Sequence, residues 1–178
     1  LLLTANWSWS QEQQKKYGGE GMPGGTKNDP KLFIAISQDG TVYITCTRSE
    51  MGQGIRTSLA LVVADEMEAD WEKCRVVQAE GDEEKYGNQN TDGSRSMRHW
   101  YEPMRQCGAV ARAMLEQAAS LGWGVDLEDV RATKHSVVFP RGRRRAGFGE
   151  LAEAVARLPV PTGSAIRLKR SNEFRYIG

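Results

Sequence analysis

Two glycine-containing loops hold the residues of this sequence that are best suited to binding a polar ligand. The first loop, Glu50–Gly54, reads Glu-Met-Gly-Gln-Gly, and the second, Gly93–Ser96, reads Gly-Ser-Arg-Ser. Glycine lets a backbone approach a bulky ligand, because it has no Cβ atom and tolerates positive φ. Amide, hydroxyl and backbone N–H groups suit a polar heterocycle or a phosphate. The loops favour ligand binding, and no residue stands out as a nucleophile or a proton-transfer group.

Each loop also has a purely structural interpretation. Gly52 and Gly54 can form a tight turn at positive φ without any ligand. Ser94 and Ser96 can cap the helix that follows them, because serine hydroxyls accept hydrogen bonds from N–H groups of a first helical turn. A ligand shared by both loops requires the two following helices to pack side by side, with both loops at one edge. Both interpretations stay open at this point.

The elements that position the first loop follow from hydrophobic periodicity. Thr41–Thr47 alternates and is β-branched, which predicts a strand, and Lys31–Ser37 predicts its partner across a turn at Gln38–Gly40. Ile55–Met67 predicts a helix whose apolar centre, Leu59–Ala64, is buried on most sides. The acidic residues that follow are expected to mark the exit of this helix to solvent: Asp65, Glu66, Glu68 and Asp70.

Further elements surround the second loop. Cys74–Glu80 predicts a third strand, and residues 81–96 predict a long polar loop. A second helix is expected with Pro103 in or near its first turn. One narrow face of this helix carries small and apolar residues that let a neighbour approach closely: Met104, Cys107, Gly108, Ala111, Leu115 and Ala118.

The last third of the chain predicts short elements. Val130–Thr133 and Ser136–Phe139 favour a hairpin, Phe148–Leu158 a short helix, and Ile166–Leu168 a last strand. Hairpins and single helices in turn, without a strict βαβα order, indicate an α+β fold.

Composition and charge bound the class of protein. The 178 residues suit one domain, or one and a fraction. The 24 Lys and Arg nearly balance the 23 Asp and Glu, so the overall charge does not favour binding to nucleic acid or a membrane surface. The basic cluster Arg141–Arg145 lacks interleaved aromatic residues and is expected to be a solvated turn. The acidic stretch Asp82–Glu84 is also expected to be solvated surface. No segment of the sequence resembles a transmembrane span.

Cysteine and histidine do not suggest a metal site. Cys46, Cys74 and Cys107 form no Cys-x-x-Cys pair, so each is expected to be a buried thiol. His99 and His135 have no metal-ligating neighbours at a suitable spacing, so surface or hydrogen-bonded histidines are expected.

The order of several motifs resembles the large subunits of molybdenum hydroxylases, the family of xanthine dehydrogenase and aldehyde oxidase. The motifs follow one another as Glu50–Gly54, Tyr86–Gln89, Gly93–Ser96, and Trp100 with Glu102 and Pro103. The resemblance is to the isoquinoline 1-oxidoreductase beta-subunit type and runs from about Lys31 to Gly178, through Phe148–Leu151 and Phe174–Gly178. It divides the chain into an N-terminal extension or linker, residues 1–30, and a partial molybdopterin-binding domain, residues 31–178.

The resemblance implies a cofactor and its contacts. The cofactor is molybdopterin, in the cytosine dinucleotide form, and [2Fe-2S] clusters are expected on a partner subunit. The implied cofactor-binding residues are Met51 and Gln53 on the pterin, Gly52 and Gly54 where the backbone admits it, and Gly93, Ser94 and Ser96 on the pterin or its phosphate. Arg95 is a further candidate for a phosphate contact.

The resemblance also implies an activity that this sequence covers only in part. The family oxidises an aldehyde or an N-heterocycle with water as the oxygen source, and its general base is a glutamate late in a longer chain. No counterpart of that glutamate is found in this sequence, so the isolated chain is expected to be inactive. The expected partners are the remaining catalytic segment, an iron–sulfur subunit and a small-molecule substrate, with no nucleic acid.

The start of the sequence bears on the cellular location, and the glycine-containing loops also allow two other functions. Leu1–Leu3 resembles the end of an export signal, which favours a periplasmic protein, with a domain edge and a cytoplasmic protein as the alternatives. One rival function is a non-catalytic binding module of the same fold. Another is a nucleotide- or phosphate-binding domain, although the first loop lacks the lysine and hydroxyl of a Walker loop.

Overall fold

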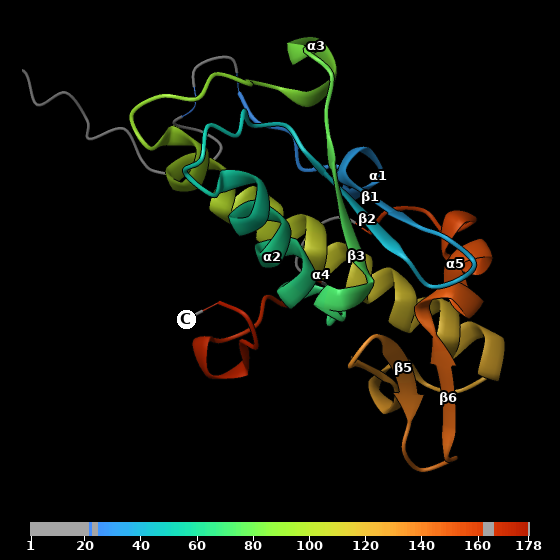
Figure 1. Cartoon of the computed structure of the whole chain (residues 1–178). Helices are drawn as coiled ribbons and strands as arrows, with labels where there is room; N and C mark the ends of the chain where they lie inside the picture. Colours follow the sequence, from blue (N-terminus) through green and yellow to red (C-terminus); the bar gives the residue numbers. More distant parts are fainter. Residues whose placement is uncertain (1–21, 23–24, 162–165, 178) are drawn as a thin grey trace, which may run out of the picture.

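A pair of helices packed side by side forms the centre of the fold (Figure 1). The structure is a computed structural model that describes Met22, residues 25–161 and residues 166–177. Helix α2 spans Ile55–Glu66 and helix α4 spans Arg95–Trp123. Both helices begin at the same end of the molecule, beneath the two glycine-containing loops.

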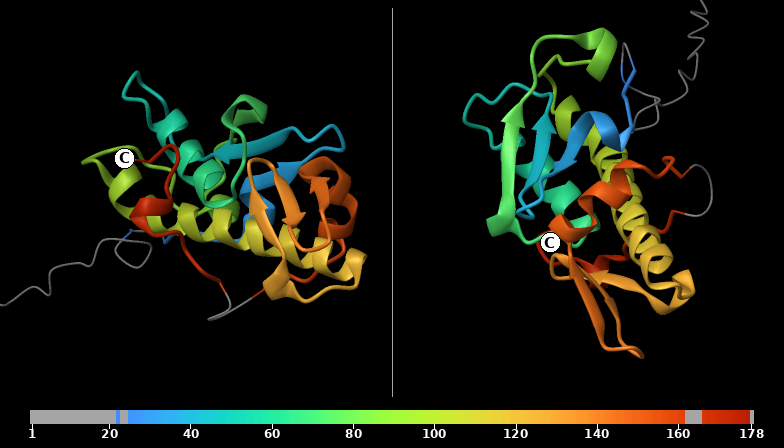
Figure 2. Two further views of the ribbon diagram at one scale, coloured as in Figure 1. Left: turned by 90° about the horizontal axis from the view of Figure 1, so that it is seen from below. Right: turned by 90° about the vertical axis from the view of Figure 1, so that its right-hand side faces the viewer.

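A small sheet covers one flank of this pair (Figure 2). Strands β1 (Ile34–Ile36), β2 (Val42–Cys46) and β3 (Cys74–Gln78) lie in that order. β1 and β2 pair antiparallel, with Ile34 opposite Ile44, which confirms the predicted hairpin. β2 and β3 pair parallel, and α2 makes the crossover between them, as parallel strands require.

The close approach of α2 and α4 depends on one glycine. A Cβ atom on Gly108 of α4 would lie 2.6 Å from the carbonyl oxygen of Val63 and 2.8 Å from the Cβ atom of Glu66. The predicted small-residue face of α4 is confirmed, because its members are all buried: Met104, Cys107, Gly108, Ala111, Leu115 and Ala118. This face therefore sets the distance between the two helices.

A second sheet lies against the C-terminal half of α4. It contains β4 (Arg131–Thr133), β5 (Ser136–Phe139) and β6 (Arg144–Gly147), all antiparallel, and is followed by α5 (Phe148–Ala156). The predicted hairpin and short helix are confirmed, whereas the sequence pattern does not predict β6. The remaining elements are short: α1 (Pro30–Phe33), α3 (Glu83–Tyr86) and 3-10 turns at Trp71–Lys73, Leu127–Asp129 and Ser171–Glu173.

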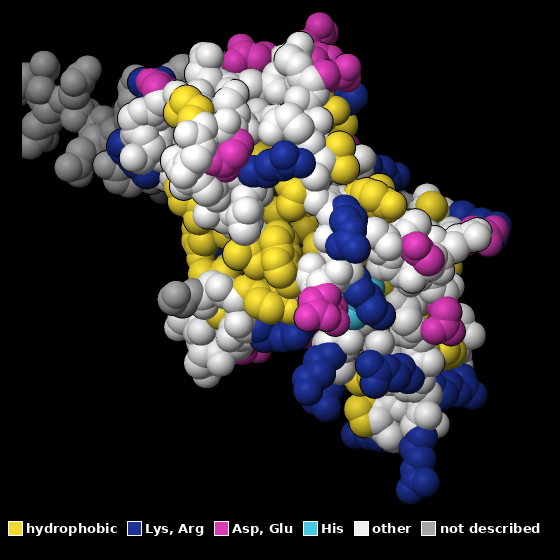
Figure 3. All heavy atoms as spheres, in the orientation of Figure 1, with side chains coloured by type: hydrophobic (Ala, Val, Ile, Leu, Met, Phe, Trp, Pro, Cys, Tyr) yellow, Lys and Arg dark blue, Asp and Glu magenta, His cyan; other side chains and the backbone are white. Residues whose placement is uncertain are grey.

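The basic cluster is exposed, as predicted, but it is not entirely a turn. Arg144 and Arg145 belong to β6, and Arg141 pairs with Asp129 at 2.9 Å. Figure 3 shows the dark-blue side chains gathered over this end of the molecule. They extend into solvent, away from the two loops.

Three predicted elements are wrong in part. Lys31–Ser37 is not one strand, because Asp29 accepts a hydrogen bond from the N–H of Lys31 and Pro30 starts the helical turn α1. Pro103 lies inside α4, since the helix begins earlier, at Arg95. Ile166–Leu168 forms no strand, because the carbonyl oxygen of Arg167 accepts from Arg112 of α4 and the N–H of the next residue, Lys169, donates to Glu66 of α2.

The expected exit of α2 to solvent is also wrong. Asp65 and Glu66 are completely buried, because residues 166–177 cover this end of the helix. Asp65 accepts hydrogen bonds from Lys169 Nζ at 2.9 Å and from the N–H groups of Arg175, Tyr176 and Ile177. We call the buried and half-buried ion pairs here the tail network: Asp65, Glu66, Glu68, Arg105, Arg112 and Lys169.

Hydrogen bonds surround the two buried carboxylates of this network, Asp65 and Glu66. Burial raises the pKa of Asp65, but donation from the N–H of Tyr176, from Lys169 and from the neighbouring N–H groups lowers it further, so the net pKa lies below the usual value. Arg105 Nε donates to Glu66 at 2.7 Å, and Arg112 Nη1 donates to the carbonyl oxygen of Glu66 at 2.6 Å. The carboxylate of Asp65 is therefore held ionised inside the protein.

The cysteines are buried and free, as predicted. Burial raises the pKa of Cys74 and of Cys107 to about 12, so neither forms an appreciable amount of thiolate at neutral pH. His99 is buried, and His135 is buried and fully hydrogen-bonded. His135 Nδ1 accepts from the N–H of Asp70 at 3.1 Å, so its Nε2–H donates to the carbonyl oxygen of Gly40 at 2.8 Å.

Parts of the N-terminal expectations fall on residues that the structure does not describe. Leu1–Leu3 and most of residues 1–30 lie outside the described residues, so the domain boundary at residue 31 stays a prediction. Within the described part, Thr26 forms a β-bridge with Gly87, and the N–H of Asn88 donates to the carbonyl oxygen of Gly25 at 3.0 Å. Across the described ranges, no helix combines the length and apolar character that crossing a bilayer demands.

Candidate functional site

The two glycine-containing loops meet at one edge of the fold (Figure 1). The backbone N–H of Ser49, at the entry to the first loop, donates to Thr91 Oγ1, at the entry to the second, over 3.2 Å. Both loops lead directly into a helix, and these helices pack against each other. The shared edge that one common ligand would require is therefore present.

The first loop is held in shape by its own glutamate. Glu50 accepts hydrogen bonds from the N–H groups of Gly52 at 2.6 Å, Gly54 at 3.0 Å and Arg56 at 3.1 Å. Donation from the N–H of Gly54, then from that of Arg56, lowers the pKa of Glu50. Its carboxylate thus takes the anion-binding position at the start of α2, and a second anion there would meet like charge.

Gln53 also bonds within the first loop. Its Oε1 accepts from the N–H of Met51 at 2.5 Å, and its Nε2 donates to the carbonyl oxygen of Ser49 at 2.8 Å. Gly52 and Gly54 have φ values of 94° and 81°, so the predicted positive-φ turn is present. Met51 is 72% exposed at the loop tip. The loop presents an amide, a thioether and open backbone to solvent.

The second loop leaves the start of α4 open. Gly93 and Ser94 have φ values of 46° and 57°, and Ser94 makes no side-chain capping bond within the described chain. The capping interpretation therefore does not hold for the Ser94 hydroxyl. The N–H groups of a first helical turn have no partner inside their own helix. That of Arg95 donates to the carbonyl oxygen of Asp92 at 2.8 Å, so those of Ser96 and Met97 are the candidate donors for an anion. The starts of α2 and α4 differ in this respect.

Ser96 lies deeper than the other predicted site residues. It is buried, and its Oγ accepts a hydrogen bond from Arg48 Nε at 2.9 Å. The hydroxyl proton stays available for donation. The role of Ser96 in binding a cofactor stays a prediction.

Arg48 is a central residue of this edge that sequence reasoning missed. It is completely buried, and its Nη1 donates to both the carbonyl oxygen and Oδ1 of Asn88. Its guanidinium lies over the ring of Trp100, 5.9 Å from the centroid. Burial lowers the pKa of Arg48, yet an arginine starts so far above neutral pH that the group stays cationic. In the sequence, the position of Arg48 between the end of a predicted strand and a glycine-containing loop is the one feature that could have indicated a role at this edge.

The Tyr86–Gln89 motif holds the segment between α3 and the second loop in place. Gln89 accepts from the N–H of Asp82 at 2.6 Å and donates to the carbonyl oxygen of Glu80 at 2.8 Å. Gly87 has a φ of 77°, and a Cβ atom there would lie 3.0 Å from the carbonyl oxygen of Gly25. This packing explains the glycine and the amide in the motif.

Comparison with known protein families identifies the family of the domain that carries this edge. The profile of the molybdopterin cofactor-binding domain matches residues 15–176, which is most of the chain. The chain belongs to the molybdopterin cofactor-binding domain family. The resemblance inferred from the motif order is thereby confirmed, and so is the α+β class.

Relatives of known name share about a third of their residues with this domain where they align. It is 37% identical over 132 residues to the beta chain of isoquinoline 1-oxidoreductase from Brevundimonas diminuta, covering 71% of this chain and 17% of that protein. It is 33% identical over 168 residues to the membrane-bound aldehyde dehydrogenase [pyrroloquinoline-quinone] of Gluconacetobacter polyoxogenes, covering 88% and 21%. It is 37% identical over 148 residues to a nicotinate dehydrogenase subunit of Pseudomonas putida, covering 83% and 12%. The chain thus spans about a fifth of the length of these relatives, or less.

Solved structures share the fold. Quinoline 2-oxidoreductase from Pseudomonas putida 86 superposes with a TM-score of 0.54 at 18% identity, over 68% of this chain and 15% of that chain. Carbon monoxide dehydrogenase from Oligotropha carboxidovorans superposes with a TM-score of 0.53 at 23% identity, over 68% and 15%. At these identities the likeness establishes the architecture alone.

The donor set at the loop edge fits a molybdopterin. Added Cβ atoms on Gly52, Gly54 and Gly93 would meet no described atom within 4 Å, so the backbone there is open to a bulky ligand. Arg48 Nη2 is buried and has no hydrogen-bond partner among the described residues. Neutral amides, open N–H groups and one spare cationic donor match a polar heterocycle that carries phosphate.

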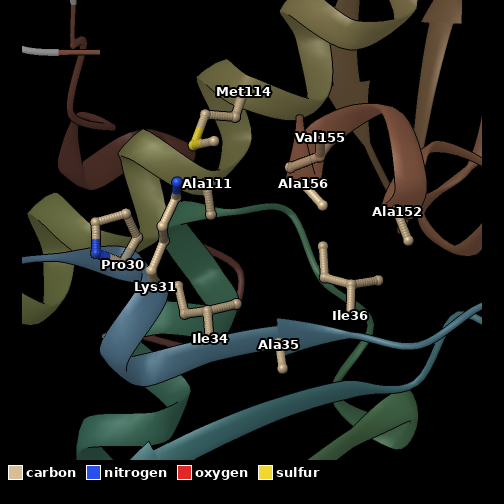
Figure 4. Close-up of a pocket in the computed structure, with 10 residues that line it drawn as sticks. All are labelled: Pro30, Lys31, Ile34, Ala35, Ile36, Ala111, Met114, Ala152, Val155 and Ala156. Atoms are coloured by element: carbon tan, nitrogen blue, oxygen red, sulfur yellow. The ribbon is translucent and has the colours of Figure 1, made fainter. Parts of the chain in front are cut away.

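Neither a metal site among the described residues nor the apolar cavity beside β1 overlaps this edge. Among the described residues, no group of three His, Cys, Asp or Glu side chains comes together to hold a metal ion. A cavity of about 350 Å³ lies between β1, α4 and α5 (Figure 4). Its lining is mainly apolar, with Ile34, Ile36, Met114 and Val155, and includes no residue of either loop.

Proposed function

We propose that this domain supplies part of the molybdopterin cradle in the catalytic subunit of a bacterial molybdenum-dependent hydroxylase or dehydrogenase. The observation that carries the proposal is the meeting of the two glycine-containing loops at one edge, joined by the bond between Ser49 and Thr91. Family membership supports the cofactor, and the named relatives support an aldehyde or an N-heterocycle as the substrate class.

The two loops would take different parts of the cofactor. Met51 and Gln53 would contact the pterin, with Gly52 and Gly54 leaving room for it. Gly93 and Ser94 would hold the phosphate at the open start of α4, because Glu50 already fills the corresponding position at α2. This division of roles favours the dinucleotide form, with its diphosphate, and we propose the cytosine dinucleotide.

When bound, molybdopterin supplies the redox chemistry that oxidises the substrate with water as the source of oxygen. The described residues of this chain would bind and orient the cofactor and exclude water from its buried side. We propose that a general base lies on the remaining catalytic segment and that electrons leave through an iron–sulfur partner subunit. The isolated chain would then be inactive.

Elemental mass spectrometry on protein purified with its partners from the native host tests this function. Near-stoichiometric molybdenum, together with a catalytic polypeptide and an iron–sulfur protein, is the expected result. One relative has pyrroloquinoline quinone in its name. Quinone extraction from the same sample tests whether the purified complex contains that cofactor. Metal-free protein with all partners present would replace the proposal by a non-catalytic binding module.

Periplasmic location is a separate part of the proposal. It rests on the resemblance of Leu1–Leu3 to the end of an export signal. Cell fractionation with marker enzymes for each compartment tests it. Recovery with the cytoplasmic marker would select the alternative.

A further inference from the structure

Arg48 joins three segments that are distant in sequence. It lies just after β2, it donates to Asn88 through Nη1, and it donates to Ser96 in the first turn of α4 through Nε. Each bond comes from a cationic donor, which makes it stronger than a bond between neutral groups. The contact with Trp100 fixes the plane of the guanidinium from a further direction.

The acceptors of Arg48 are all neutral. Asn88 offers a carbonyl and an amide oxygen, and Ser96 offers a hydroxyl. No described carboxylate pairs with this buried cation, and its Nη2 has no partner among the described residues. Asp92 and Glu83 act on Arg48 only as more distant negative charges. A buried cation that lacks a directly paired carboxylate is costly unless a structural or binding role requires it.

We propose that Arg48 is the positioning residue that holds the two cofactor loops in register, with its positive charge fixed beside the first turn of α4 by the bond from Nε to Ser96. This inference rests on the proposed function for its cofactor part, and on the hydrogen bonds alone for the coupling of the loops. Arg48 acts through Asn88 and Ser96, which carry the Thr91 and Gly93–Ser96 segments.

Amide hydrogen exchange on the full chain tests the coupling of the loops. The reporters are the hydrogen-bonded N–H groups of Ser49 and Asn90, which bond to Thr91 and Asn88. Arg48→Met should speed their exchange about tenfold, the factor expected for one lost charge-assisted hydrogen bond. The N–H of Ala79, which bonds to Cys46 beside the sheet, should keep its rate.

A matched control separates this effect from the general loss of an arginine. Arg75 is exposed on β3 and donates to the carbonyl oxygens of Glu72 and Cys74, away from both loops. Arg75→Met should leave Ser49 and Asn90 unchanged. If Arg48→Met fails to fold, Ser96→Ala removes only the acceptor of Nε and should still speed exchange at the Arg95 N–H.

Molybdenum content tests the cofactor part. In the complex with its partners, Arg48→Met should lower molybdenum per chain several-fold, Arg48→Lys should lower it less, and Arg75→Met should not change it. Unchanged exchange at both reporters would overturn the coupling. Faster exchange with full molybdenum would overturn the positioning role. Absence of molybdenum from the unaltered complex would overturn the proposed function, while the exchange rates still decide the coupling.

Discussion

The two ends of the α2–α4 pair use buried charge in opposite ways. At the loop end, one cation, Arg48, meets neutral acceptors and keeps an unpartnered Nη2 within the described chain. At the tail end, carboxylates and cations alternate, and Asp65 alone accepts hydrogen bonds from a lysine and three backbone N–H groups. The tail end is satisfied internally, and the loop end retains donors.

This difference separates a structural charge cluster from a binding edge. A buried network whose groups are all paired contributes to holding the fold, since removing one member leaves the others unpaired. A buried donor with an unused hydrogen-bonding position costs folding free energy, and it suits a ligand that brings the missing acceptor. Variants at the tail should therefore change stability, and variants at the loops should change cofactor retention.

The largest effect is expected from breaking the tail network. Asp65→Ala should lower the free energy of unfolding by about 3–5 kcal/mol, because Lys169 and the N–H groups of residues 175–177 lose a buried acceptor. Urea denaturation followed by circular dichroism measures this. The control is Glu153→Ala, which breaks an exposed pair with Arg157 and should cost less than about 0.5 kcal/mol. Equal effects of both substitutions would contradict the comparison.

The next effect lies between the two ends, where α2 touches α4. Gly108→Val should lower the free energy of unfolding by about 1–3 kcal/mol, because its side chain would press on Val63 and Glu66. Gly122→Ala, in the same helix and with no described atom within 4 Å of the added carbon, should raise stability by up to about 1 kcal/mol. Thermal melts of the two variants should shift in opposite directions. A stabilising Gly108→Val would show that the helices can move apart.

A smaller and different effect is expected at the loop end. Gln53→Ala removes an amide that would bind the pterin and that also bonds to Met51 and Ser49. It should weaken cofactor retention by about 1–3 kcal/mol while changing the stability of the fold much less. Molybdenum per chain in the complex measures the effect, with exposed Gln38→Ala as the control. Full molybdenum in the Gln53 variant would count against the assigned contact.

The smallest effect is the pH dependence of His135. Burial lowers its pKa from the usual value of 6.5, against the raising effect of its bond to Gly40; Lys73 lowers it and Asp70 raises it. The unfolded chain therefore binds the proton more readily, so stability falls as pH drops below 6.5 toward the folded-state pKa. Urea midpoints between about pH 7.5 and 5 should fall less in His135→Gln than in the unaltered chain. Equal falls of the urea midpoint with pH in both proteins would contradict the role of His135.

The sequence predicts the elements wherever local pattern and burial agree. The strand Thr41–Thr47, the helix after the first loop and the small-residue face around Gly108 all follow from periodicity, and the structure contains each of them. The same reasoning fails for Asp65 and Glu66, because acidic residues after an apolar run normally face water. Their burial depends on a segment about a hundred residues away, which no local pattern reports.

The site shows the same limit. Glycine and amide residues predict the two loops, because their conformational and hydrogen-bonding properties can be recognised from a few neighbouring residues. The role of Arg48 cannot be predicted in this way, because it depends on contacts with Asn88 and Ser96. These residues are 40 and 48 positions away in the sequence, and only the fold brings them together. Pro103 misleads for a related reason: proline is typical of a first helical turn, and only the long helix built on tertiary contacts tolerates it inside.

The internal bonds of Glu50 have a consequence for the speed and strength of ligand capture. Because its carboxylate already holds the N–H groups of Gly52, Gly54 and Arg56, the first loop is pre-organised before any ligand arrives. The conformational entropy of shaping the loop is lost during folding and not during binding. An incoming cofactor then does not have to offset the cost of ordering this loop from its contact energy.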